Sequence, residues 1–471
     1  MEKPTIILAT SNGVGMGHLA RASAVALALK EVANPIIVSM AGGIAEIPSF
    51  MGIRCEYIPG RDRMWMSREK WDVYLRDRLL ALVEETGAKV LSFDGVVPYP
   101  GVIAAKNANP NLKLVWVRRG LWQKKPQRFI LGLQSKMMDK IIEPGDIARA
   151  YDFGPTSKRK DSVLTSPVSL FRKEDAMSRD DARKALGLDL NRPAALVQLG
   201  TGEGDVNEKM TAALSGLLGW KDLQVILTKA PVDKDGKSLA PEGLDLKVAR
   251  YFPLAKVLHA FDAGICATGY NGVHELLPAQ VPTVFVSNIR GTDDQEARAK
   301  WCNDFGFALR ADQADLSDIT AKVKMLQDPD VRKRLSEKCA ELPDTTGGQE
   351  IAAMLFKLAV EEKPVVVNTF TFRRLMAQDH INRGLRHVAN LGLRRLALVF
   401  RYFFPHKNRQ VIDQQPPVFG EQATSAELHP LIKSSTRFEH LISGASDTYR
   451  KRREEIAFTA YGKETVEIKS K

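Results

Sequence analysis

The chain has 471 residues, more than one ordinary hydrophobic core holds, so we expect two domains. Hydrophobic residues make up 44% and charged residues 26%, which excludes a mostly disordered chain. The net charge is +12, but residues 363–471 alone hold 19 basic and 10 acidic residues. The rest of the chain therefore lacks the composition of a nucleic-acid-binding surface, and we expect no nucleic acid partner.

Residues 1–160 alternate short apolar runs with helical stretches. Strands are predicted at 5–10, 35–40, 54–58, 90–93 and 112–117, and helices at 19–31 and 68–85. Apolar strands that alternate with helices predict a parallel, doubly wound, Rossmann-like sheet.

A second series of the same kind follows residues 154–169, whose composition is that of a linker. Its strands are predicted at 194–199, 224–228, 263–267 and 283–287, and its helices at 179–186, 207–218, 254–260 and 272–279. The predicted fold class is therefore α/β with two doubly wound parallel-sheet domains, residues 1–160 and 170–362. Ligands of such sheets bind at the carboxyl ends of the strands, here in the cleft between the domains.

Residues 363–471 are predicted to form a basic, partly flexible tail. Within it, residues 371–404 are predicted to form an amphipathic helix with apolar side chains on one face and arginines opposite. Such a helix suits an anionic membrane surface, although it could also pack on the protein itself or on a partner.

Cysteine spacing and hydropathy bear on location. The four cysteines lie far apart, without the spacing of a zinc site or a disulfide scaffold. The N-terminus lacks the pattern of a signal peptide, and no run approaches the roughly 18 apolar residues of a membrane span. We therefore expect a cytoplasmic protein, peripheral on the inner face of the cell membrane.

The first motif is SNGVGMGHLAR, residues 11–21, between a predicted strand and a predicted helix. Gly13, Gly15 and Gly17 allow a tight turn and a close approach to a phosphate or to the acceptor. The spacing is GxGxG rather than the GxGxxG of a dinucleotide site, and the second strand does not end in an acid. A turn without a ligand is the alternative.

Two side chains near this loop are candidates for catalysis. His18 begins the helix, where a neutral imidazole could take a proton from an attacking hydroxyl, or could simply pack or cap. Asp94 follows the strand at 90–93 and is the second candidate acid or base.

The second motif is QLGTGEGD, residues 198–205, again between a strand and a helix. Gly200, Thr201 and Gly202 form a second turn that favours phosphate, or only a turn. A Walker A loop is excluded, because no Lys-Ser or Lys-Thr pair follows.

The third motif spans residues 252–299 and carries Glu275, Asp294 and Gln295. A carboxylate that accepts two hydrogen bonds and an amide that donates and accepts are suited to a ligand rich in hydroxyls. The alternatives are that Glu275 only stabilises the start of a helix and that Asp294 and Gln295 form a solvated cap.

This third motif resembles the donor-binding half of GT-B glycosyltransferases, and among them the family 28 enzymes of the MurG type. Residues 11–21 resemble the first Gly-rich loop of that family, and residues 94–105, DGVVPYPGVIAA, resemble the loop that shapes its acceptor side. The resemblance covers about 350 residues, with every block in order.

The resemblance implies a role for each matching residue. Glu275 would bind the ribose hydroxyls of a UDP-sugar, and the backbone at Phe252 would recognise uracil. Thr268, Gly269 and residues 200–202 would bind the diphosphate. Asp294 and Gln295 would hold the sugar hydroxyls, and His18 would be the base.

The implied activity is inverting transfer of a hexose, such as N-acetylglucosamine, from a UDP-sugar to a hydroxyl of a lipid-linked or cell-envelope glycan. The UDP-sugar is a substrate; no cofactor and no metal is implied, and the DxD triplets at 233–235 and 328–330 are interpreted as surface charge. A non-hydrolysing UDP-sugar epimerase and a non-catalytic subunit that recruits a partner are the alternatives.

The chain also departs from the family. Its first loop is one residue longer, Gln280 and Asp294 stand where relatives often have Gly and Gln, and Arg118 and Arg119 replace a neutral polar loop. The identity of the sugar and of the acceptor therefore stays open.

Overall fold

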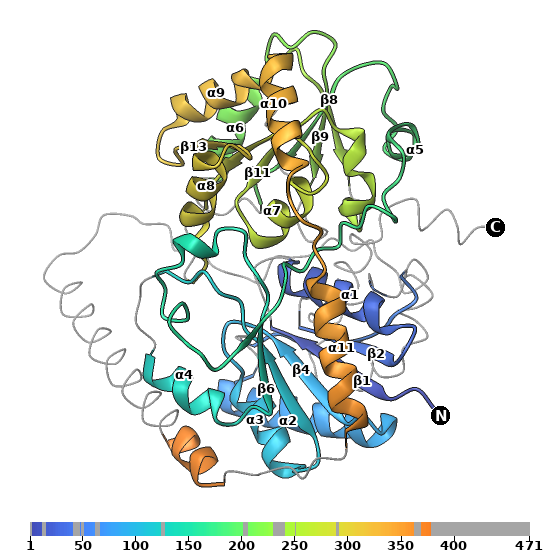
Figure 1. The fold of residues 1–471 in the computed structure, drawn as a ribbon, viewed down its shortest axis with the longest axis vertical. Coiled ribbons are helices and arrows are strands. Elements are labelled where there is room, and N and C mark those ends of the chain that lie inside the picture. Colours follow the sequence, from blue (N-terminus) through green and yellow to red (C-terminus); the bar gives the residue numbers. More distant parts are fainter. Residues whose placement is uncertain are drawn as a thin grey trace, which may run out of the picture.

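The computed structural model describes residues 2–11, 16–40, 48, 51–61, 66–123, 128–200, 206–228, 241–249, 251–288, 292–361 and 369–377. Within these residues two parallel sheets lie one above the other along the long axis, each with helices against it (Figure 1). The predicted α/β class with two doubly wound sheets is confirmed.

The first sheet has seven strands in the described residues, in the order β3-β2-β1-β4-β5-β6-β7. These are β1 (Thr5–Thr10), β2 (Asn34–Ser39), β3 (Arg54–Tyr57), β4 (Val90–Asp94), β5 (Lys113–Val117), β6 (Lys140–Glu143) and β7 (Val163–Leu164). All neighbours are parallel. Its helices are α1 (Gly17–Leu29), α2 (Arg68–Thr86), α3 (Pro100–Ala108) and α4 (Arg128–Ser135), with a 3₁₀ turn η2 (Arg149–Tyr151). The strand order reverses between β1 and β4, which is where a ligand of such a sheet binds.

The second sheet has six strands in the described part of the chain, in the order β10-β9-β8-β11-β12-β13. These are β8 (Ala194–Gln198), β9 (Gln224–Thr228), β10 (Asp245–Ala249), β11 (Ala263–Ala267), β12 (Thr283–Val286) and β13 (Leu309–Ala311). Its helices are α5 (Arg179–Ala185), α6 (Val206–Gly216), η3 (Leu254–Ala260), α7 (Tyr270–Leu276), α8 (Gln295–Asp304), α9 (Leu316–Met325) and α10 (Pro329–Cys339). Here the order reverses between β8 and β11, so α7 begins at the expected ligand edge.

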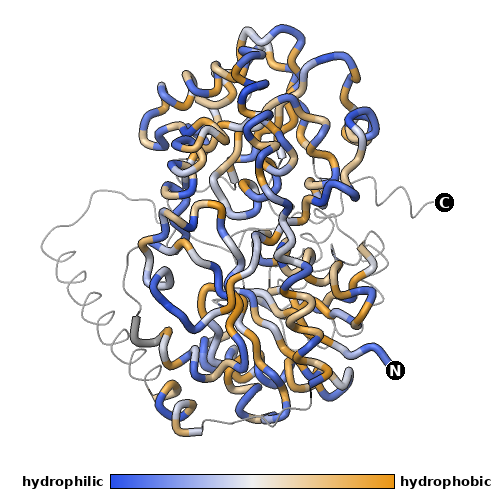
Figure 2. Tube along the Cα trace, in the orientation of Figure 1, coloured by the Kyte–Doolittle hydropathy of each residue, from blue (hydrophilic) through white to orange (hydrophobic). Residues whose placement is uncertain are grey.

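Apolar side chains hold the helices on the sheets, and Figure 2 shows hydrophobic residues along the strands of the first sheet. Helix α2 follows the predicted pattern, with Trp71, Leu75 and Leu79 fully buried on its inner face. One predicted helix is of another kind: residues 254–260 form the 3₁₀ helix η3.

The stretch predicted as a linker, residues 154–169, is partly strand. Val163 and Leu164 form β7, which pairs with β6 at the edge of the first sheet. Both side chains are exposed because β7 lies at the edge of the sheet. A strand in that position needs no run of buried apolar residues, so the segment can have the polar composition of a linker.

Helix α11 (Gly347–Val360) lies in the range assigned by sequence to the second domain, yet it packs on α1, β1 and β4 of the first sheet (Figure 1). Ile351 and Leu355 are fully buried in that contact. Lys113, at the start of β5, donates from Nζ to the carbonyl of Leu358 (2.6 Å) near the end of the helix. The chain therefore crosses between the sheets twice.

The structure describes only the beginning of the predicted tail helix. Residues 369–377 are helical, and Leu375 is buried against Ile103, Leu133 and Met137 of the first domain. The rest of residues 371–404 lies outside the described residues. No helix in the described part of the chain is long and apolar enough to span a membrane.

Candidate active site

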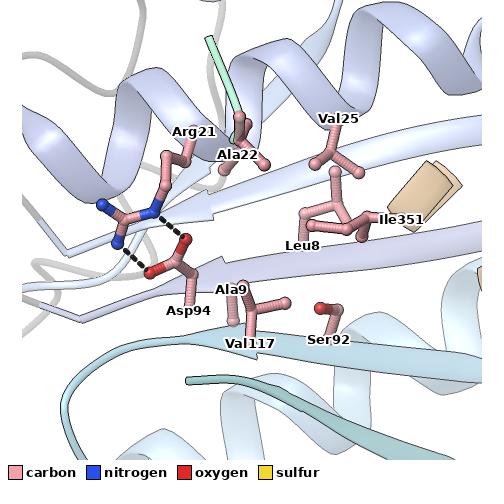
Figure 3. A pocket seen from close by; sticks show the side chains of 10 residues that line it. Leu8, Ala9, Arg21, Ala22, Val25, Ser92, Asp94, Val117 and Ile351 are labelled. Atoms are coloured by element: carbon pink, nitrogen blue, oxygen red, sulfur yellow. Dashed lines mark hydrogen bonds and ion pairs between the residues drawn. The ribbon is translucent and has the colours of Figure 1, made fainter. Parts of the chain in front are cut away.

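The first group of site residues lies where α1 begins and β4 ends. His18 is on the first turn of α1, and Asp94 is the last residue of β4, the strand beside β1. Nδ1 of His18 is 2.7 Å from Oδ1 of Asp94. Arg21, three residues further along α1, donates from Nε to Oδ2 (2.9 Å) and from Nη2 to Oδ1 (2.6 Å) of the same carboxylate (Figure 3). The two predicted catalytic residues are thus in contact.

A small pocket lies beside the Arg21–Asp94 pair (Figure 3). It is lined by Leu8, Ala9, Arg21, Ala22, Val25, Ser92, Asp94, Val117, Val168 and Ile351. Most of this lining is apolar and comes from α1, α11 and the strands of the first sheet. The ion pair therefore lies against a dry interior, where its electrostatic interaction is stronger than at the surface.

Burial and neighbouring charge set the protonation of this group. Burial lowers the pKa of His18, and the hydrogen bond and charge of Asp94 offset this only in part, so the ring is neutral at pH 7. Burial alone would raise the pKa of Asp94, but the Arg21 guanidinium and His18 bring it down to about 2. Nδ1 lies 2.7 Å from the Asp94 carboxylate and 2.9 Å from Nη2 of Arg21. We assign the imidazole proton to Nδ1, because the ionised carboxylate accepts it and Nη2 already donates to the same carboxylate at the shorter distance of 2.6 Å. Nε2 then keeps the lone pair that a general base needs.

The start of α7 in the second domain meets the start of α1. Asn271 donates from Nδ2 to the carbonyl of Gly17 (3.2 Å). The guanidinium carbon of Arg21 lies 5.1 Å from the ring centre of Tyr270, in a cation–π contact. These contacts bring the start of α7 next to the first turn of α1, which carries His18.

Arg298 of α8 ties the second domain to the first. It is fully buried and donates to Asp146 of the first domain from Nε (3.1 Å) and Nη2 (2.8 Å). It also donates from Nη2 to Asp293 (3.0 Å) and from Nη1 to the carbonyl of Thr268 (2.7 Å). The two carboxylates satisfy this buried cation, and together they fix the end of β11 against the first domain.

His274 makes a second tie. Its Nε2 accepts from the backbone N–H of Ile147 (3.1 Å), and its Nδ1 therefore donates to the carbonyl of Tyr270 (2.7 Å). Burial lowers the pKa of His274 to about 4. The neutral ring required by this pair of hydrogen bonds is thus the stable form at pH 7.

The segment after β5 forms the seam between the domains, which we define as residues 121–123 and 292–294. The N–H of Asp294 bonds to the carbonyl of Leu121 (3.0 Å), and the N–H of Gln123 to that of Thr292 (2.9 Å). Between them lies a short antiparallel bridge. The seam therefore joins the two domains beside Asp293.

Two residues predicted to bind the diphosphate lie at this junction. Thr268 is fully buried, with its hydroxyl 3.3 Å from that of Ser287. Gly269 is the N-cap residue of α7, and a Cβ atom added there would meet open space. The backbone is therefore accessible at Gly269, next to helix N–H groups that have no partner within the helix.

Glu275 lies on the second turn of α7, because this helix begins at Tyr270 rather than at the predicted Gly272. It therefore does not stabilise the helix start, which excludes that alternative. Its carboxyl group is partly buried and makes no hydrogen bond or ion pair to another described residue. Burial raises its pKa to about 8.

Asp294 and Gln295 are used within the protein. Asp294 caps α8 by accepting from the N–H of Ala297 (3.1 Å). Gln295 is buried and accepts from the N–H of Asn288 (2.9 Å), so it is not part of a solvated cap. That both also hold sugar hydroxyls stays a prediction.

The remaining predicted residues are less well placed. Gly200 follows β8 with a φ of +98°, which favours glycine, and Asn288 donates to the carbonyl of the preceding Leu199 (2.9 Å). Phe252 lies before η3, partly buried against the core, and no described contact joins it to the start of α7. Gly13, Gly15, Thr201 and Gly202 lie outside the described residues.

The described residues contain no group of three or more His, Cys, Asp or Glu side chains that could hold a metal ion. Asp328, from one DxD triplet, caps α10 by accepting from the N–H of Asp330 (2.8 Å). The other triplet, residues 233–235, lies outside the described part of the chain.

Sequence reasoning missed several residues of this junction. Arg21 was detectable, because it lies one turn after His18 on the same helix. Asp146, Tyr270, His274, Asp293 and Arg298 form the rest of the missed group. Their partners lie up to 152 positions away along the chain, so no local pattern marks them.

Comparison with known proteins supports the resemblance that the sequence motifs show. No protein-family model matches the chain. Several bacterial curated relatives carry the name UDP-N-acetylglucosamine–N-acetylmuramyl-(pentapeptide) pyrophosphoryl-undecaprenol N-acetylglucosamine transferase. The one from Cutibacterium acnes is 24% identical over 292 residues, which are 59% of this chain and 74% of the relative. The one from Rhodococcus opacus is 23% identical over 391 residues, or 77% and 98%.

Among solved structures, a UDP-glucosyltransferase from Polygonum tinctorium matches 77% of this chain and all of its own, with a TM-score of 0.55 and 13% identity. That identity is too low to carry more than the fold. The chain has the GT-B glycosyltransferase fold, and its curated relatives are transferases of the MurG type, which confirms the resemblance seen in its motifs.

Proposed function

We propose that this protein is an inverting glycosyltransferase that moves a hexose, such as N-acetylglucosamine, from a UDP-sugar to a hydroxyl of a lipid-linked or cell-envelope glycan. The observation that carries the proposal is the partly buried His18–Asp94 pair, which lies beside the contact between Gly17 of α1 and Asn271 of α7. The relatives named above, which act on a pyrophosphoryl-undecaprenol acceptor, support the choice of donor and acceptor.

In the proposed reaction Nε2 of His18 takes the proton of the acceptor hydroxyl as its oxygen attacks the anomeric carbon. The bond from that carbon to the diphosphate breaks, and UDP leaves from the opposite face, so the anomeric configuration inverts. The ring becomes an imidazolium, which the ionised Asp94 stabilises through Nδ1–H. Arg21 acts on the carboxylate and is a positioning residue.

The donor would bind on the second domain. Thr268, Gly269 and residues 200–202 would hold the diphosphate, Glu275 the ribose, the backbone at Phe252 the uracil, and Asp294 and Gln295 the sugar. Backbone N–H groups can stabilise the departing diphosphate without a metal, so we expect transfer to continue in the presence of a chelator.

The acceptor would reach His18 from the first domain, beside the loop with Gly13, Gly15 and Gly17. A lipid-linked acceptor would place the protein on the cytoplasmic face of the membrane. Residues 371–404 would then contribute basic and apolar side chains to an anionic lipid surface.

The test combines binding with turnover. UDP, GDP and dTDP sugars are titrated by calorimetry, and UDP release is then followed with an undecaprenyl-pyrophosphate-linked sugar as acceptor probe. We expect selective UDP-sugar binding in both wild type and His18→Gln. The variant should lose 10²- to 10⁴-fold in turnover, the usual contribution of a general base.

Each alternative has its own result. Interconversion of UDP-sugars without release of UDP would indicate the epimerase. Absence of any nucleotide binding would overturn the transferase proposal in favour of a non-catalytic subunit. Normal turnover of His18→Gln would remove His18 as the base.

A further inference from the structure

Arg119 is an arginine whose donors are unused. It follows β5 at the junction of the domains, and 15% of its side chain is exposed. Its Nε is buried without a hydrogen-bond partner. Within the described residues its nearest carboxylate is Asp293, with Nη1 3.6 Å from Oδ2, beyond hydrogen-bond distance. A guanidinium offers five N–H donors, and one that makes an ion pair but no hydrogen bond to a described residue calls for an explanation.

The other two arginines of the junction make a clear contrast. Arg21 makes two hydrogen bonds to Asp94, and Arg298 bonds to both Asp146 and Asp293. Their side chains are only 3% and 0% exposed. The carboxylates at the junction are therefore already bonded by Arg21 and Arg298, which leaves Arg119 as the accessible cation.

The position of Arg119 places its charge close to the reacting groups. Arg119 lies two residues before the seam, whose other side ends at Asp294, next to Gln295. Its charge acts on His18 and on Arg21. A group bound by Arg119 would thus lie between the proposed base and the residues proposed to hold the transferred sugar.

We propose that Arg119 binds an anionic oxygen group other than the donor diphosphate, a carboxylate or a phosphate, that one of the two substrates carries next to the reacting centre. The planar fork of a guanidinium suits such a group, with two parallel N–H donors. The inference rests on the proposed function and adds that one substrate is acidic: either the transferred sugar is a uronate, or the acceptor bears its anion near the attacking hydroxyl. Asp293 keeps its bond to Arg298 when Arg119 turns to the ligand.

Calorimetry with three probes distinguishes an anion on the donor sugar from an anion on the acceptor. UDP reports the nucleotide site alone. UDP-glucuronate compared with UDP-glucose reports an acid on the donor sugar. Inorganic phosphate, titrated into the UDP-bound protein, reports an anion on the acceptor side. The proteins compared are wild type, Arg119→Gln, Arg119→Lys and, as a matched control, Arg76→Gln, which removes a partly exposed arginine paired with Asp77 on α2.

We expect wild type and Arg76→Gln to prefer UDP-glucuronate or to bind phosphate. Arg119→Gln should weaken that one interaction at least tenfold, with UDP affinity within about twofold of wild type. Arg119→Lys should fall between them, because an ammonium lacks the fork. Thermal melts check that the variants fold, and if Arg119→Gln does not, Arg119→Lys carries the comparison.

Three results would overturn the inference while leaving the proposed function intact. In the first, wild type shows no preference for either anion. In the second, Arg119→Gln binds every probe with the affinity of wild type. In the third, Arg119→Gln lowers the affinity for UDP by the same factor as the affinity for the anion, which would indicate that Arg119 binds the diphosphate. A wild type that binds no UDP would instead overturn the proposed function.

Discussion

Two carboxyl groups of the candidate site have opposite protonation at pH 7, although both are buried in part or in full. Asp94 bonds to a guanidinium and keeps a pKa of about 2, whereas Glu275 has no described partner and burial raises its pKa to about 8. The difference comes from one neighbouring cation rather than from depth. His18, Asp94 and Glu275 were all visible in sequence, because each lies at a strand end or in a motif. Their charge states were not, because those of His18 and Asp94 depend on where Arg21 lies and that of Glu275 depends on its burial.

The protonation of Glu275 gives a pH dependence. Ribose hydroxyls donate hydrogen bonds to the ionised carboxylate, so binding lowers its pKa and releases a proton below pH 8. We expect UDP affinity to rise from pH 6 to pH 8, by at most about tenfold per pH unit. Calorimetry at three pH values measures this. Glu275→Gln should bind more weakly and with a flatter profile. An affinity of wild type that does not change with pH would rule out this role.

At the scale of elements, the alternation of strands and helices predicted most of both sheets, and the misses have physical causes. Strand β7 is an edge strand with exposed side chains, so its composition is that of a linker. Helix α11 is apolar enough to be buried, but a sequence pattern does not show against which sheet. The close backbone packing at the start of α11 determines which sheet the helix packs against.

Gly347 and Gly348 form a matched pair for testing that packing. A Cβ at Gly347 would lie 2.0 Å from the carbonyl oxygen of Ser166, whereas one at Gly348 would lie 3.4 Å from that of Ala24. Alanine normally stabilises a helix by up to about 1 kcal/mol over glycine. We expect Gly348→Ala to be neutral or slightly stabilising, and Gly347→Ala to lower the free energy of unfolding by about 1–3 kcal/mol. Urea unfolding measures both; equal effects would contradict the predicted close contact.

At the scale of the whole molecule, buried polar ties join the two domains: Arg298 to Asp146, His274 to Ile147, and Asn271 to Gly17. None of them could be predicted from sequence, because each joins residues more than 120 positions apart. The sequence does predict where they lie, since the carboxyl ends of both sheets face the cleft.

The tie at His274 predicts an acid sensitivity. Its pKa falls from 6.5 to about 4 on folding, so its neutral form stabilises the fold fully above pH 6.5, and this contribution is lost as the pH falls through 4. The difference amounts to about 3 kcal/mol. The raised pKa of Glu275 changes stability in the opposite direction between pH 4.5 and 8. The pH dependence of wild-type stability therefore does not isolate the effect of His274.

The measurement is therefore the difference in unfolding free energy between His18→Gln and the double variant His18→Gln/His274→Gln, in which the amide oxygen of residue 274 can still accept from Ile147. His18→Gln is present in both because, within the described residues, His18 is the other histidine with a lowered pKa. We expect the advantage of the protein that retains His274 to shrink steadily from pH 7 to pH 4. A constant difference across that range would show that His274 does not titrate as described.

The double crossing of the chain constrains how the cleft opens. The two crossings are bonded side by side: the N–H of Gly347 to the carbonyl of Pro167 (3.1 Å), and the N–H of Ser166 to the carboxylate of Glu350 (3.2 Å). Paired crossings form a single hinge axis, because a rotation there stretches neither segment. A rotation of one domain about this axis would have to break the backbone hydrogen bonds of the seam, so those bonds stabilise the arrangement of the two domains seen here.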